Sequence, residues 1–169
     1  ELPGGRSITF KGYADRVDVG ADGSASVIDY KTGGVWGFEE SERDPLARGR
    51  KLQLPVYGLA ARSRLGGVPV RVAYWFVSEK GNFKQICYDL DPAALQRFSD
   101  VVAVLVDGVE AGLFPARPGE KNKNCTFCDF TSMCPGDREV SWAKVRDAAE
   151  LSRYVNLTER PNPPEVDAP

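Results

Sequence analysis

Two acidic residues and a lysine form the set in this sequence best suited to chemistry on a phosphate. They occur in Gly12-Tyr13-Ala14-Asp15-Arg16 and Val27-Ile28-Asp29-Tyr30-Lys31. If residues 21–23 form a three-residue turn between two strands, Asp15 lies opposite Asp29, with Cβ atoms about 4.5–5.5 Å apart. Strand alternation then puts Lys31 on the face of Asp29 and turns Tyr30 to the opposite face, toward the core.

Two opposed carboxylates destabilise a sheet unless a cation lies between them. Hard oxygen ligands at this separation suit Mg²⁺ or Mn²⁺, which also accept water and a substrate phosphate. Lys31 would orient the attacking water or offset charge on the pentavalent phosphorane. The alternative is a solvated Asp15–Lys31 ion pair of little energetic value, and a two-residue turn would shift the register and separate the two acids.

Three cysteines, Cys125, Cys128 and Cys134, form a second candidate site with the spacing C-x2-C-x5-C. They lie in a segment, residues 115–137, that is expected to be irregular. Three thiolates at this spacing suit a tetrahedral metal or an iron–sulfur cluster. The alternative is three free or partly oxidised thiols. Cys87 falls in an expected strand and is interpreted as a small core residue.

Elements that would position these residues follow from hydrophobic patterning. Strands are expected over residues 7–19, 24–31, 68–78 and 83–90, and helices over residues 52–65 and 92–112. Residues 35–50 are expected to form an exposed loop, residues 142–154 a short final helix, and the proline-rich tail, residues 159–169, a disordered segment. This order predicts an α/β fold with a mixed sheet flanked by helices.

The composition of the chain excludes several classes of catalytic and metal site. The chain has 169 residues, 22 Lys and Arg against 24 Asp and Glu, a net charge of −2 and no histidine. The absence of histidine excludes Ser-His-Asp triads and any metal site that needs imidazole from this chain. No stretch approaches the ~18 apolar residues of a membrane span, and the absence of targeting signals favours the cytoplasm. Because the sequence opens on Glu1 without a methionine, we expect a fragment of a longer protein.

The motif G-x-x-D-R-x-D, followed by I-D-Y-K-T-G and Q-L-x-x-Y, resembles the PD-(D/E)XK nucleases, closest to the RecB-like nuclease domains of helicase–nucleases and CRISPR-adaptation nucleases. Asp15, Asp29 and Lys31 match the acidic and lysine motifs, and Gln53 and Tyr57 match the helix motif that follows. The resemblance, over residues 8–157, implies a restriction-endonuclease-like fold and Mg²⁺- or Mn²⁺-dependent hydrolysis of DNA, with single-stranded DNA as the expected substrate, in recombination or repair. It also implies that Asp15, Asp29 and the backbone carbonyl of Tyr30 hold the metal.

One branch of these nucleases carries a [4Fe–4S] cluster on a C-x2-C-x5-C segment, with a fourth cysteine upstream of the first aspartate. No cysteine precedes Asp15, so we expect the fourth ligand in a missing N-terminal part. The implied organisation is a nuclease core in residues 1–114, a Cys-rich knot with a terminal helix in residues 115–158, and a tail in residues 159–169. A helicase domain or subunit is the implied partner.

Two rival functions stay open: a catalytically silent DNA-binding or scaffolding module, and a zinc-binding structural domain. The basic run from Arg43 to Lys51, next to the aromatic Trp36 and Phe38, is either a phosphate-contacting rim with base-stacking aromatics or a solvated loop.

Overall fold

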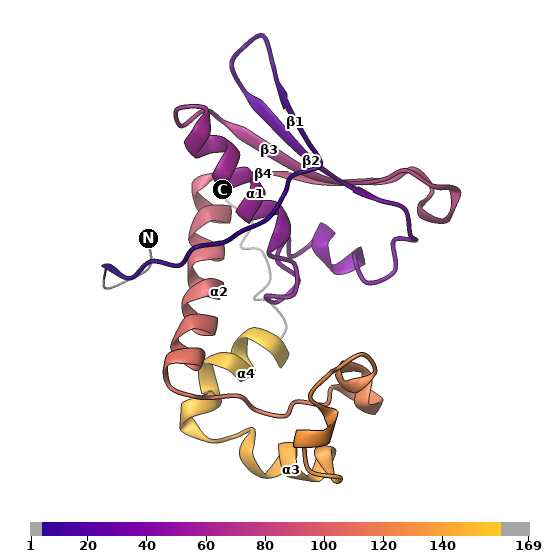
Figure 1. The fold of residues 1–169 in the computed structure, drawn as a ribbon, viewed down its shortest axis with the longest axis vertical. Coiled ribbons are helices and arrows are strands. Elements are labelled where there is room, and N and C mark those ends of the chain that lie inside the picture. The colour runs from indigo at the N-terminus through magenta and orange to yellow at the C-terminus, as the bar shows by residue number, and fades with distance from the viewer. Residues whose placement is uncertain (1–4, 160–169) are drawn as a thin grey trace, which may run out of the picture. The chain divides into compact units, whose positions relative to one another are not determined.

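The computed structural model describes residues 5–159, which form two compact units divided between Ala103 and Val104. The first unit contains one four-stranded sheet in the order β1-β2-β3-β4 (Figure 1). Its strands are β1 (Arg16–Val19), β2 (Ala25–Lys31), β3 (Val70–Phe76) and β4 (Gln85–Asp89). The domain boundary expected after residue 114 stays a prediction.

The sheet is mixed, as the sequence predicts. The β1–β2 and β3–β4 pairs are antiparallel, and β2 and β3 are parallel. Parallel neighbours need a crossover connection, and helix α1 (Gln53–Arg64) supplies it by packing against β2 and β3. Helix α2 (Pro92–Glu110) follows β4, so both long helices lie close to their expected positions.

The β1–β2 register is the predicted one. Arg16 pairs with Ile28 and Val17 with Val27. The turn is closed by Gly20 N, which donates to Ser24 O at 2.8 Å, and Gly23 adopts a positive φ of 83°. The three-residue turn assumed from the sequence therefore sets the pairing of the two acidic strands.

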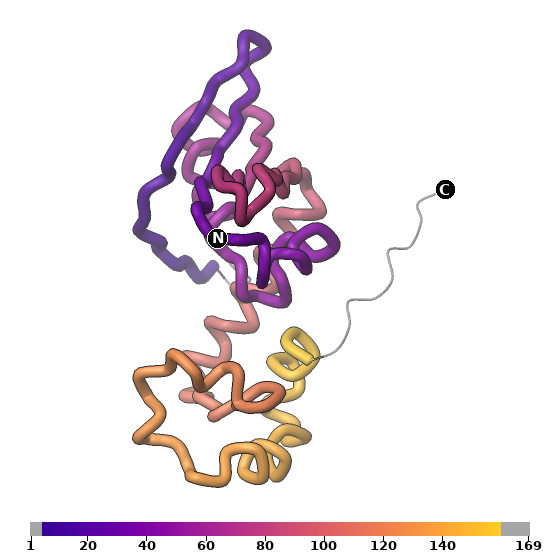
Figure 2. The backbone as a smooth tube through the Cα atoms, turned by 90° about the vertical axis from the view of Figure 1, so that its right-hand side faces the viewer, coloured from indigo at the N-terminus to yellow at the C-terminus, as the bar shows by residue number. Residues whose placement is uncertain are grey.

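The first strand is shorter than expected. Residues 7–14 form no strand, and Figure 2 shows that they follow an extended path. Their apolar side chains do not pair with β2: the Phe10 ring lies 6.2 Å from that of Phe98 in α2. All eight of these residues are exposed, and the Phe10 ring contact with α2 takes the place of a ladder bond only at that one position.

Close packing of α1 on the sheet builds the core. Leu54 and Ala61 of the helix lie with Val27, Val72, Tyr74 and Phe76 of the strands in one buried cluster. Gly58 marks the closest approach, since a Cβ there would lie 2.7 Å from Val72 Cγ1 and 2.3 Å from Leu90 Cδ1. This contact fixes the height of α1 above β2 and β3.

The expected exposed loop at residues 35–50 is partly buried instead. It contains the 3-10 helix η2 (Glu39–Glu42), and Ser41, Asp44 and Leu46 are buried. The Asp44 carboxylate accepts the backbone N–H groups of Leu46 and Arg48. Because these bonds satisfy the buried chain, a polar segment can pack inside.

Short helices form the second unit. They are η4 (Glu120–Cys125), η5 (Thr131–Met133), α3 (Arg138–Val145), η6 (Ala149–Leu151) and α4 (Ser152–Glu159). The single final helix expected over residues 142–154 is two helices, because Ala148 adopts an extended conformation between them.

Trp142, Leu151 and Val155 make the small core of this unit, and Trp142 Nε1 and Arg117 Nε both donate to Glu159 Oε1. Glu159, expected in the tail, is thus the last residue of α4. Residues 160–169 of that tail lie outside the described residues. No helix in the described part of the chain is long and apolar enough to cross a membrane.

Candidate active site

Asp29 is an acid at a core position. Ala25, Val27 and Asp29 alternate along β2 on the face that α1 covers, and Asp29 is only 2% exposed. A buried carboxylate is costly unless it is paired or binds a cation. The buried Asp29 carboxylate therefore needs a positively charged partner or a bound cation.

Lys31 is that partner and begins a line of polar contacts. Its Nζ makes an ion pair with Asp29 Oδ2 and donates to Gln53 Oε1 at 3.1 Å. Gln53 Nε2 then donates to Tyr57 Oη at 3.3 Å. Gln53 and Tyr57 lie one helical turn apart on α1, so β2 and α1 together bring four predicted site residues into one connected set.

The Asp15 carboxylate reaches β2 at the backbone of Tyr30. It directly precedes β1, at the position after the last pair of the ladder, and its Oδ2 accepts the backbone N–H of Tyr30 at 2.9 Å. The Asp15 side chain is exposed, in contrast to Asp29. The Asp15 carboxylate thus lies at Tyr30, the residue that follows Asp29 in β2. Asp29 is buried, whereas Asp15 is open to solvent.

Tyr30 turns to the opposite face, as expected from alternation, but it is not a core residue. It is half-buried, its ring lies 5.8 Å from that of Trp75, and its hydroxyl accepts a hydrogen bond from Arg16 Nη1. In the described residues no helix packs on this face as α1 does on the other, which leaves the Tyr30 ring partly in solvent.

Aromatic rings line the position of Lys31. Its Nζ lies 5.2 Å from the Tyr74 ring centroid and 5.9 Å from that of Phe38. Burial, then the nearby Asp29 charge, raises the pKa of Tyr74 above the usual value, so this hydroxyl stays protonated. These rings exclude water on one side of the ammonium and strengthen its electrostatic interactions.

Gly12 and Tyr74 are site neighbours that the sequence interpretation missed. A Cβ at Gly12 would lie 2.9 Å from Tyr57 Cε1 and 3.2 Å from its hydroxyl. The glycine opening the first acidic motif thus leaves room for the tyrosine ring. Its position three residues before Asp15 is the only sequence signal of this role.

The oxygen donors fit a hard divalent cation. Asp29 Oδ2 is buried and has no hydrogen-bond donor among the described residues, since its contact with Lys31 lacks hydrogen-bond geometry. The Asp15 carboxylate and the Tyr30 backbone complete an all-oxygen set of the kind Mg²⁺ prefers. Within residues 5–159 no three Asp, Glu, Cys or His side chains converge as a ready-made metal cluster. The fit therefore rests on two carboxylates and a main-chain oxygen.

In the described residues the cysteine segment does not gather a ready-made set of metal ligands. Cys125, Cys128 and Cys134 are free, half-buried thiols, and the described chain brings no three potential ligands together. Phe127, between the first two, is 97% exposed. The expected Cys-rich knot is thus not seen as a metal centre.

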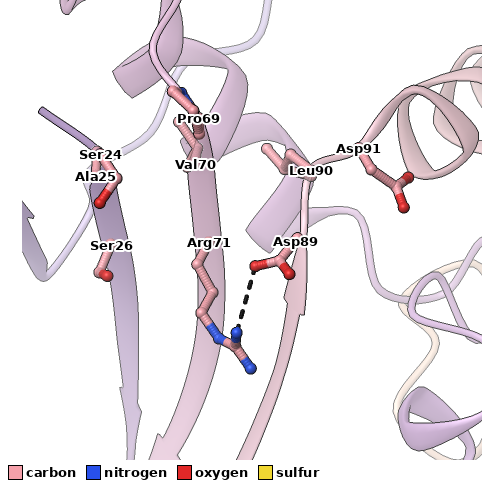
Figure 3. Close-up of a pocket in the computed structure, with 9 residues that line it drawn as sticks. All are labelled: Ser24, Ala25, Ser26, Pro69, Val70, Arg71, Asp89, Leu90 and Asp91. Atoms are coloured by element: carbon pink, nitrogen blue, oxygen red, sulfur yellow. Dashed lines mark hydrogen bonds and ion pairs between the residues drawn. The ribbon is translucent and has the colours of Figure 1, made fainter. Parts of the chain in front are cut away.

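Cys87, expected in the core, is exposed on β4, where Arg71 Nη2 lies 3.2 Å from its sulfur. Figure 3 shows Arg71 beside Asp89 in a pocket at the beginning of the parallel strands β2 and β3. The candidate site lies at the other end of β2, so this pocket is separate from it.

Comparison with known proteins gives one match. The family model of the PD-(D/E)XK nuclease superfamily matches residues 1–135, while no curated protein and no solved structure matches the chain. Members of this superfamily are generally nucleases that use divalent metals such as Mg²⁺, with DNA as the implied substrate. The matched range includes the residues of the candidate site, namely Asp15, Asp29, Tyr30, Lys31, Gln53 and Tyr57. This chain belongs to the PD-(D/E)XK nuclease superfamily.

Proposed function

We propose that the first unit is the catalytic domain of a RecB-like nuclease that hydrolyses phosphodiester bonds of single-stranded DNA. The observation that carries the proposal is the contact line Asp29–Lys31–Gln53–Tyr57. In a solvated ion pair both charges would be exposed. Here Asp29 is buried, Lys31 lies close to two aromatic rings, and Gln53 and Tyr57 of α1 extend the line of hydrogen bonds. The arrangement instead holds one ammonium group beside a carboxylate, as phosphate chemistry requires.

Asp15, Asp29 and the Tyr30 carbonyl would hold Mg²⁺ or Mn²⁺, which when bound supplies Lewis-acid activation of water and phosphate. Lys31 Nζ faces the same carboxylate and would offset negative charge on the reacting phosphate. Gln53 fixes the position of that ammonium, and Tyr57 fixes Gln53. Gln53 and Tyr57 are thus positioning residues.

Exposed aromatic side chains near the motifs support a single-stranded substrate. Trp36 is 85% exposed and Tyr13 is 83% exposed, and each lies within five residues of a site residue in the sequence. Unpaired bases stack on such rings, at about 1–3 kcal/mol per base, without regard to sequence. Phe38 does not serve this purpose, because it packs against Tyr74 and Phe76.

The test is cleavage of labelled single-stranded DNA with Mn²⁺ by the wild type, Asp29→Asn and Lys31→Ala. Asp18→Asn is the matched control, since Asp18 is a partly exposed acid of the same hairpin, paired with Arg16. Cleavage should persist in the control and be lost in both site variants, with folding verified by circular dichroism. Full cleavage by both site variants would refute the mechanism. Metal-independent DNA binding without cleavage would favour the silent scaffolding module.

For the second unit we propose, from the cysteine spacing, a [4Fe–4S] cluster completed by a ligand outside this chain, in a cytoplasmic helicase–nuclease of recombination or repair. Iron content and visible absorbance of anaerobically purified full-length protein test this. Tightly bound zinc without iron would favour the structural zinc domain instead.

A further inference from the structure

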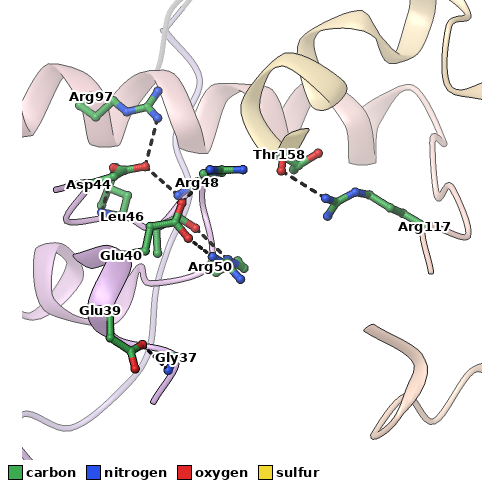
Figure 4. Close-up of polar contacts among 11 residues, drawn as sticks. Gly37, Glu39, Glu40, Asp44, Leu46, Arg48, Arg50, Arg97, Arg117 and Thr158 are labelled. Atoms are coloured by element: carbon green, nitrogen blue, oxygen red, sulfur yellow. Dashed lines mark hydrogen bonds and ion pairs between the residues drawn. The ribbon is translucent and has the colours of Figure 1, made fainter. Parts of the chain in front are cut away.

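Most basic side chains next to the candidate site are already neutralised. Figure 4 shows Arg48 and Arg50 directed at Glu40, with Arg48 Nε 2.7 Å from its Oε1. Lys31 is paired with Asp29. Arg48 and Arg50 therefore have little charge to offer an incoming anion.

Lys51 differs from them. Its Nζ lies 3.4 Å from the centroid of the Phe38 ring, and no carboxylate pairs with it in the described part of the chain. It directly precedes Leu52, the N-cap of α1, whose first turn contains no acidic residue. The positive charge of Lys51 is therefore unbalanced by its surroundings.

Lys51 also lies beside the reactive end of the sheet. Phe38, which Lys51 covers, is the same ring that Lys31 Nζ approaches to 5.9 Å. Burial, the positive charge of Lys31 and then that of Arg50 lower the pKa of Lys51. The ring is held by edge contacts with Tyr74 and Phe76, at centroid distances of 4.9 and 5.3 Å. Two ammonium groups thus share one fixed aromatic ring.

We propose that Lys51 is a substrate-binding residue that contacts a phosphate of the nucleic-acid strand next to the group attacked at Asp29 and Lys31. The inference rests on the proposed nuclease function and adds a residue to it. A phosphate at this place would relieve the repulsion between the two ammonium groups, since no carboxylate of residues 5–159 forms an ion pair with Lys51. Phe38 holds the ammonium by a cation–π contact while leaving its hydrogen-bond donors available.

A purely structural role would use only the alkyl stem of Lys51 to cover Phe38. Lys51→Met keeps an unbranched side chain over the ring and removes the charge, whereas Lys51→Arg keeps the charge. The matched control is Arg64→Met, because Arg64 is an exposed cation in the last turn of α1. That turn is roughly 16 Å from the first turn at 1.5 Å per residue.

The experiment measures binding of a fluorescent single-stranded oligonucleotide without divalent metal, by anisotropy, between 50 and 200 mM salt. Each phosphate contact in a single strand contributes about 0.7 to the slope of log K against log salt. We expect Lys51→Met to lower that slope by about 0.7 with unchanged thermal stability, Lys51→Arg to restore it, and Arg64→Met to leave it at the wild-type value. In the cleavage assay Lys51→Met should raise KM more than it lowers kcat.

A wild-type slope in Lys51→Met, or an equal loss in Arg64→Met, would overturn the assignment while leaving the nuclease function intact. A wild type that neither binds nor cleaves the oligonucleotide would overturn the proposed function and this inference together.

Discussion

The ion pair between Lys31 and Asp29 allows a quantitative test of the site without any assay of activity. The Asp29 side chain is 3% exposed and that of Lys31 is 25% exposed. Removing one partner of a buried pair leaves an uncompensated charge and costs about 3–5 kcal/mol. Since Lys31 keeps a quarter of its surface in solvent, we expect Lys31→Met to lower the free energy of unfolding by about 3 kcal/mol, the low end of that range.

The double variant Asp29→Asn/Lys31→Met should recover much of this loss, because the buried charge is gone together with its partner. We expect a coupling energy of about 2 kcal/mol from the double-mutant cycle, measured by urea unfolding at pH 7. Lys84→Met is the matched control. Lys84 pairs with Glu42 on the surface, so its loss should cost under about 1 kcal/mol.

Two results would refute the reasoning. One is a Lys31→Met loss no larger than that of Lys84→Met, which would mean that Asp29 is solvated in the folded protein. The other is additive single variants, which would mean that the two charges do not interact.

Four further substitutions test local packing, at the site and elsewhere in the fold. Gly12→Ala should push aside the Tyr57 ring and lower cleavage by about 10- to 100-fold at unchanged thermal stability, so wild-type turnover would contradict the contact. Gly58→Ala should destabilise by about 1 kcal/mol, since overpacking of 1–3 kcal/mol outweighs a helix gain of about 1 kcal/mol. At Gly108 in α2 a Cβ would meet Leu113 O at 4.0 Å, an ordinary contact, so Gly108→Ala should stabilise by about 0.5–1 kcal/mol. Chemical denaturation compares the two variants. Tyr88→Phe removes a buried hydroxyl that has no hydrogen-bond partner in residues 5–159, so stability should hold or rise by about 1 kcal/mol. Burial raises the pKa of Tyr88, so the folded protein keeps a proton that the unfolded chain loses above about pH 10, and the variant should lose stability less steeply in alkaline unfolding titrations.

The acidic hairpin could be predicted because its geometry is local. A three-residue turn fixes the pairing, and alternation then decides which side chains share a face. Asp29 and Lys31 emerged on one face, and the pairing of Arg16 with Ile28 is the predicted one. The prediction was wrong about the length of the first strand. The eight residues before Asp15 have strand-like sequence but stay exposed outside the sheet, and Phe10 contacts Phe98 of α2.

Features that depend on distant contacts were not predictable in this way. Residues 35–50 were expected to be exposed because many of them are polar. In the structure the Asp44 carboxylate satisfies backbone donors inside the loop and lies near Arg97 of α2. Cys87 was placed in the core for the opposite reason: cysteine is usually buried, but β4 presents it on the open face beside Arg71.

The position of Asp29 also explains why this site can be recognised at all. At the same point of β2 a valine would fill the core without cost, as Val27 does two residues earlier. An acid there must be compensated by Lys31, and Lys31 in turn is held by Gln53 and bordered by Tyr74. Lys31 and Gln53 are themselves polar residues beside an apolar core. The proposed function accounts for both, because it needs a carboxylate oxygen shielded from bulk water at the end of β2. An apolar side chain at this position would serve folding alone better, which supports the proposed catalytic role of Asp29.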